Sequence, residues 1–91
     1  MSIKIEVVRV IRGCKAYSTG NKFTYQNSKI IPENCDTNGC ANAQATIITN
    51  IGRLLFHNPL YVSCLDAGLT SEGCGNVIFK IIKVENEYET N

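Results

Sequence analysis

The chain has 91 residues, enough for one small domain, and 44% of them are apolar while 19% are charged. This composition is globular and excludes an intrinsically disordered chain. Nine Lys and Arg against eight Asp and Glu leave a net charge of +1, which argues against a nucleic-acid-binding protein and against a polyanion mimic.

The first predicted element is a strand over residues 3–11, in which apolar side chains alternate with Lys4 and Glu6. Turn-forming residues over 15–21 lead into a short strand predicted over 22–25. A polar segment with only one short apolar pair comes after this strand. The first third of the chain therefore favours β-structure.

One principal helix is predicted over about residues 38–56. It begins with good capping residue types at 36–38 and then follows a helical period of apolar residues. Gly52 lowers helix propensity by about 1 kcal/mol relative to alanine, so fraying is expected there. The Asn58-Pro59 pair terminates the helix.

Two further strands are predicted, a short one over 60–65 and a long one over 77–84, separated by a glycine-rich loop over 66–75. The chain is therefore expected to form a single α+β domain over residues 1–85, with a frayed acidic tail at 86–91. The fold is a small, mostly antiparallel sheet with the helix packed on one face. The two terminal strands, the most apolar segments, should lie side by side.

The compartment is predicted from the N-terminal residues and from the hydropathy pattern. After Met1 the residues alternate between polar and apolar types, which is not the pattern of a secretory signal. No stretch approaches the roughly 18 apolar residues needed to span a bilayer. A cytoplasmic protein without a membrane partner is expected. Cytosolic thiols are normally reduced, and the odd number of cysteines argues against complete disulfide pairing.

Five cysteines are the unusual feature of the composition. Cys14, Cys35 and Cys74 stand beside turn-forming residues, where ligands from different loops can converge. Cys40 falls on the apolar stripe of the predicted helix near its N-terminus, and Cys64 lies in an apolar run that suggests a core position. The predicted metal site therefore consists of the three loop cysteines with Cys40, or Cys64 in its place, holding zinc or an iron–sulfur cluster.

Two other functions remain open at this level. A thiol-redox or cysteine-nucleophile protein would use Cys35 or Cys40 at the helix N-terminus, where the helix dipole favours a thiolate. An interaction module with incidental thiols would form a homodimer through an apolar sheet face. No C-x2-C pair or phosphate-binding motif supports a more specific assignment, and a catalytic role for His57 is less favoured.

Three short cysteine-containing motifs span most of residues 3–84. They are Gly13-Cys14 with Gly20-Asn21-Lys22-Phe23, Pro32-Glu33-Asn34-Cys35-Asp36, and Cys74-Gly75-Asn76-Val77-Ile78-Phe79-Lys80. In these motifs the chain resembles a family of small prokaryotic cysteine-containing proteins that has no assigned activity. The resemblance implies a shared set of Cys14, Cys35 and Cys74. The chain departs from the family pattern at Lys15, where proline is usual, and in its additional Cys40 and Cys64.

Overall fold

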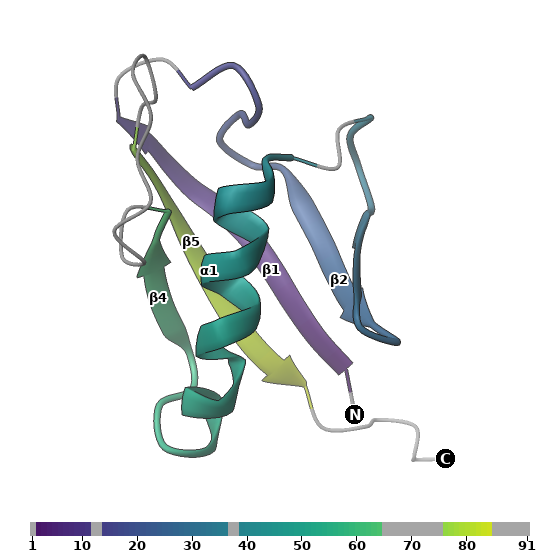
Figure 1. Ribbon diagram of the computed structural model, residues 1–91, viewed down its shortest axis with the longest axis vertical. Coiled ribbons are helices and arrows are strands. Elements are labelled where there is room, and N and C mark those ends of the chain that lie inside the picture. Colours follow the sequence, from purple (N-terminus) through teal and green to yellow (C-terminus); the bar gives the residue numbers. More distant parts are fainter. Residues whose placement is uncertain (1, 12–13, 37–38, 65–75, 85–91) are drawn as a thin grey trace.

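The computed structural model describes residues 2–11, 14–36, 39–64 and 76–84 (Figure 1). These residues form a sheet of five strands with one helical segment packed against it. The elements are β1 (Ser2–Ile11), β2 (Lys22–Gln26), β3 (Lys29–Pro32), the α-helix α1 (Ala41–Asn50), the 3₁₀ helix η1 (Ile51–Leu55), β4 (Leu60–Ser63) and β5 (Asn76–Val84).

The sheet has the strand order β3-β2-β1-β5-β4, and every neighbouring pair is antiparallel. The strands nearest the two ends of the chain, β1 and β5, pair from Ser2–Val84 to Ile11–Asn76, with one bulge between Val7 and Arg9. The predicted α+β class, antiparallel sheet and adjacent terminal strands are therefore confirmed. In Figure 1, α1 crosses one face of the sheet and leaves the other face open.

The core lies between α1 and the covered face of the sheet. Phe79 on β5 is fully buried, and its neighbours on β1 and β2, Val7 and Phe23, are at most 1% exposed. The helix contributes Ala43 and Ile47, both 1% exposed. Alternation along each strand sends every second side chain into this layer, so the apolar residues predicted to share one face of β1 form the core.

The helical segment is shorter and less regular than predicted. Cys40 is the N-cap of α1, and the helix changes to 3₁₀ geometry at Ile51, one residue before the Gly52 at which fraying is expected. The segment then ends at Leu55 and not at residue 56. The predicted first helical position, 38, and the capping position 37 lie outside the described residues.

The strand β3 is the element that the sequence indicated least clearly. It pairs with β2 through a two-residue turn at Asn27 and Ser28, which have φ angles of 54° and 64°. Positive φ at both turn positions gives a hairpin turn whose twist matches that of the strands. The predicted loop over 66–75 and the tail at 86–91 lie outside the described residues, so those two predictions are untouched by the structure.

No helix within the described part of the chain is both long and apolar enough to cross a membrane.

Candidate functional site

Tyr17, a residue that sequence reasoning did not assign to a site, connects the core of the sheet to the beginning of α1. This side chain lies beyond the end of β1 and is only 6% exposed. Its ring meets Phe23 and Phe79 edge to face, with centroid distances of 5.9 Å and 5.1 Å. The two phenylalanines belong to the core, so the ring of Tyr17 is held by the sheet and its hydroxyl reaches the beginning of α1.

The backbone before α1 is shaped to receive that hydroxyl. The N–H of Cys40 donates a hydrogen bond to Tyr17 Oη over 3.1 Å. The preceding residue, Gly39, has a φ of +82°, and a Cβ built on it would overlap the phenol group of Tyr17. Only glycine combines this backbone conformation with so close an approach. The contact fixes the N-cap of α1 against the core.

Three thiols lie within electrostatic range of the Tyr17 hydroxyl. Burial raises the pKa of Tyr17 to about 12, the hydrogen bond from Cys40 N–H acts in the opposite direction, and negative charge on Cys40, Cys14 and Cys64 raises the pKa further. These cysteines come from three segments that are distant in the sequence. We refer to them, with Tyr17, as the thiol cluster.

Each thiol of the cluster is fixed by a neighbouring structural element. Cys14 lies just beyond β1, and its Sγ accepts a hydrogen bond of 3.4 Å from the N–H of Ala16. Cys64 lies at the end of β4, and its Sγ accepts one of 3.3 Å from the N–H of Val77 on β5. Cys40 is the N-cap of α1. All three are partly buried, so each thiol lies at the margin of the core on a regular element or directly beside one.

The cluster differs in composition from the predicted set of Cys14, Cys35, Cys74 and Cys40. Cys35 is also half-buried and packs against the core, but it is not among the residues whose charge acts on Tyr17. Cys64, expected in the core, is half-buried and belongs to the cluster. Cys74 lies outside the described residues. The sequence signal that could have indicated Cys64 as a site residue is its position at the end of an apolar run, directly before a glycine-rich segment.

The chemistry of the donors fits a soft metal ion, because thiolates select zinc, Cu(I) and iron–sulfur centres over hard cations. Among the described residues, no three His, Cys, Asp or Glu side chains are grouped closely enough to hold a metal ion. Any ion held here would therefore require the thiols to close toward one another.

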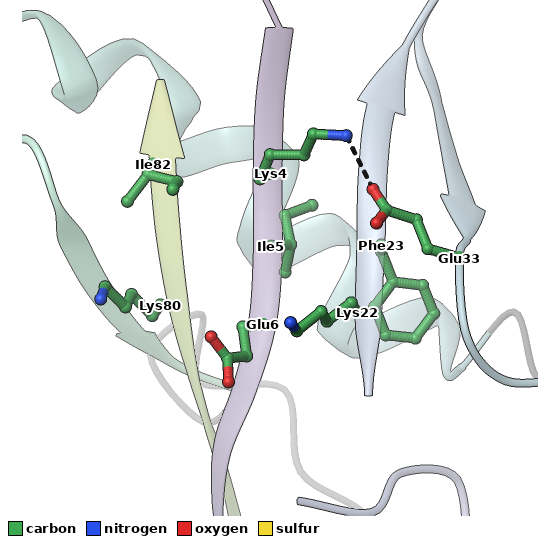
Figure 2. A pocket seen from close by; sticks show the side chains of 8 residues that line it. All are labelled: Lys4, Ile5, Glu6, Lys22, Phe23, Glu33, Lys80 and Ile82. Atoms are coloured by element: carbon green, nitrogen blue, oxygen red, sulfur yellow. Dashed lines mark hydrogen bonds and ion pairs between the residues drawn. The ribbon is translucent and has the colours of Figure 1, made fainter. Parts of the chain in front are cut away.

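A concave region separate from the thiol cluster lies on the open face of the sheet, which is the face opposite α1. Figure 2 shows this pocket, which has a volume of about 260 Å³. The side chains that face it are charged apart from Ile82, and the residues that line it are Lys4, Glu6, Lys22, Glu33, Lys80 and Ile82 together with Ile5 and Phe23, whose side chains are buried in the core. Sequence reasoning named Lys4 and Glu6 only as the polar side of β1. The alternation of residues on that strand is the signal that places them on one face.

The charged side chains of this pocket lie beside side chains of opposite charge on neighbouring segments. Lys4 Nζ lies 2.9 Å from Glu33 Oε2, and the hydroxyl of Thr24 also donates to that carboxylate. These two hydrogen bonds, from Thr24 and then from Lys4, lower the pKa of Glu33. The strand register places Glu6 between Lys22 and Lys80 on neighbouring strands. The pocket is thus a solvated charged surface that tethers the end of β3 to β1.

The chain matches no known family profile, no curated protein and no solved structure.

Proposed function

We propose that the protein binds a thiophilic metal ion through the thiol cluster, with zinc the first candidate and an iron–sulfur centre the second. The observation that carries the proposal is that Cys14, Cys40 and Cys64, which come from three separate segments, are all partly buried against the core and that the charge of each acts on Tyr17. Three partly buried thiols from three separate segments are the kind of set from which thiolate metal sites are built. Cys74, predicted from the sequence as a ligand, is the candidate for a fourth.

Two features of the cluster support metal binding over a purely structural role. First, the sulfur atoms lie at strand ends and at a helix N-cap and not inside apolar strands, where buried structural cysteines are usual. Second, the positive end of α1 carries no acidic residue in its first turn. The positive end of the helix dipole is therefore not offset by a neighbouring carboxylate.

The direct test is a titration of the reduced full-length chain with Co²⁺ under anaerobic conditions. Coordination by thiolates produces a sulfur-to-cobalt charge-transfer absorption, and addition of Zn²⁺ should remove it. We expect saturation at one ion per chain and a rise in thermal stability, because an ion that binds only the folded state stabilises it. A chain that shows neither the absorption nor the stabilisation contradicts the proposal.

Single cysteine substitutions locate the site. Changing Cys14, Cys40 or Cys64 to serine should abolish or strongly weaken the absorption. Cys35→Ser is the matched control, since this thiol is also half-buried and packs on the core but its charge is not among those that act on Tyr17. The reverse result, with Cys35 required and Cys64 dispensable, would reject the cluster as the site. Cys74→Ser reports separately whether a fourth thiolate is supplied.

A second candidate function is thiol–disulfide exchange by Cys40, favoured by its position as the N-cap of a ten-residue helix. In such an exchange a thiolate attacks a substrate disulfide, forms a mixed disulfide and releases one substrate thiol. A resolving thiol, for which Cys14 is the candidate, then forms the intramolecular disulfide as the second substrate thiol leaves. Rapid reduction of a small disulfide by metal-free protein, lost in Cys40→Ser but retained in Cys35→Ser, would favour this function.

A further inference from the structure

The two edges of the sheet are built differently. The open face of the sheet is charged, which makes it a poor apolar interface, so the edges decide how another chain can be added. The edge strands are β3 and β4. An edge strand presents unpaired backbone N–H and C=O groups, which another strand can bind unless the edge is protected by proline, charge or irregular geometry.

The edge at β3 is protected. The N–H of Glu33 donates to the carbonyl of Lys22, so the backbone groups of Glu33 point toward β2. Hydrogen-bonded and non-bonded pairs alternate along an antiparallel ladder. The preceding residue, Pro32, which is opposite Phe23, therefore points its backbone groups away from β2. Proline has no N–H to offer there. Lys29 adds a charge at the beginning of the same strand. A strand added at β3 would find few donors and a like charge if it came from another copy.

The edge at β4 is not protected in this way. The N–H of Cys64 donates to the carbonyl of Val77 over 3.0 Å. Hydrogen-bonded and non-bonded pairs alternate along an antiparallel ladder, so Tyr61, opposite Lys80, points both its N–H and its C=O away from β5. The strand Leu60–Ser63 contains no charged residue and no proline.

Exposed apolar side chains are concentrated beside this edge. The side chain of Tyr61 is 56% exposed on β4, and Leu55 and Phe56, on the connection that enters β4, are 73% and 82% exposed. Figure 1 shows this connection at the beginning of β4, at the outer side of the sheet. Leu55 and Phe56 are the most exposed large apolar side chains in the described part of the chain, and contiguous exposed apolar surface is typical of protein–protein interaction sites.

We infer that β4 is the site of homodimerisation, in which β4 of a second copy pairs with it antiparallel about a two-fold axis at Tyr61. The two Tyr61 residues would exchange both of their outward hydrogen bonds, as an isologous interface requires. The result is one continuous sheet across two copies, with both helices on the same face. This inference is independent of the metal proposal.

The edge is complementary to itself, because Tyr61 points both a donor and an acceptor outward, and charge does not oppose a second copy. The nearest like charges on the open face are Lys80 and its equivalent in the second copy, which would be separated by two β4 strands. Three strand spacings of about 4.8 Å place them roughly 14 Å apart, beyond the screening length of about 8 Å at physiological ionic strength. A neutral edge is therefore joined to a neutral edge without repulsion.

The test is the oligomeric state of the full-length chain, measured by sedimentation over a range of concentrations in the presence of a reductant, which excludes disulfide-linked pairs. We expect a reversible dimer that Tyr61→Lys weakens by at least about tenfold in dissociation constant, because like charges placed directly opposite across a strand pair repel. Ile31→Lys is the matched control, since Ile31 is 44% exposed on the opposite edge strand and shares the open face. This control should dimerise normally.

Two further variants keep the test decisive if Tyr61→Lys fails to fold. Phe56→Ser alters a side chain that is 82% exposed and should weaken the dimer without loss of monomer stability. Tyr61→Pro removes the outward N–H but no ladder bond to β5. A wild-type chain that remains monomeric at about 1 mM, the dissociation constant of a very weak complex, overturns the inference. A dimer disrupted by Ile31→Lys and not by the Tyr61 variants does so equally.

Discussion

The two faces of the sheet are made by the same strands, yet they differ in almost every physical respect. On the covered face, Val77, Phe79 and Ile81 of β5 are fully buried. On the open face, the alternate residues Lys80 and Ile82 line a solvated pocket with lysines and glutamates. The covered face therefore contributes most of the buried apolar area that stabilises the fold, whereas the open face contributes little to stability and leaves its charged side chains in contact with solvent.

The largest expected effect comes from Phe79→Ala. Deleting a fully buried phenyl group costs about 3–5 kcal/mol in the free energy of unfolding, and this ring also supports Tyr17. The adjacent Lys80→Ala, on the open face, should change the free energy of unfolding by no more than about 0.5 kcal/mol. Urea denaturation of both variants measures the contrast. Equal costs on the two faces would show that the division between them is mistaken.

The next effect concerns the contact between Gly39 and Tyr17. Gly39→Ala places a side chain at a φ of +82° and against the phenol group, so we expect a loss of about 2–4 kcal/mol from strain and overpacking together. Gly20→Ala is the control, because Gly20 has a φ of +95° but open space around its Cβ position. The difference between the two melting curves isolates the close approach. A control that costs as much as Gly39→Ala would remove the contact from the explanation.

A smaller effect is expected from Tyr17→Phe, which keeps the ring in the core but deletes the acceptor for Cys40 N–H. One such hydrogen bond contributes about 1 kcal/mol. The variant should also speed amide exchange at Cys40, measured by NMR, because the N-cap of α1 is released from the core. Tyr25→Phe provides the comparison, since the Tyr25 hydroxyl makes no hydrogen bond within the described residues. Unchanged exchange at Cys40 would argue against this role.

The smallest effect belongs to the open face and depends on pH. The pKa of Glu33 is lowered in the folded state by Thr24 and Lys4, so its contribution is present above the unfolded pKa and disappears as the pH falls through the folded pKa. Because the pair is about a third exposed or more, it is worth only about 0.2–1 kcal/mol. Glu33→Gln should therefore be less stable than wild type at pH 7 and equal to it in strong acid. Chemical denaturation across that pH range would contradict the assignment if the difference between the two proteins stayed constant.

The sequence predicted the frame of the fold because its strongest patterns are local and repeated. Alternation in residues 3–7 and 77–82 identified β1 and β5, and the helical period identified α1. The strand β3 was harder to predict because Lys29–Pro32 has only two aliphatic residues and depends on pairing with β2. Propensity alone carries little information for so short a strand.

The site was predicted in part, for a physical reason. Cys14 and Cys40 were named from their positions at turns and at the helix start, and both lie in the thiol cluster. Cys64 was assigned to the core because its neighbours are apolar, and it does pack against the core, but the apolar run gave no sign that its charge would also act on Tyr17. The central place of Tyr17 arises from packing on Phe79, a contact between residues far apart in the sequence that no local pattern encodes.

The pairing of β1 with β5 also has a consequence for how the chain acquires its structure during synthesis. The hairpin of β2 and β3 can form beside β1 early, since these strands are close in sequence. The strand β4, by contrast, pairs with β5 alone among the strands that the structure describes, and β5 is made last of the five. Until β5 emerges, three surfaces remain exposed: the strand β4, the edge of β1 that later pairs with β5, and the apolar side of α1. A ribosome-bound chain that stops before residue 76 thus presents its least protected surfaces together, and these are the surfaces that chaperones bind.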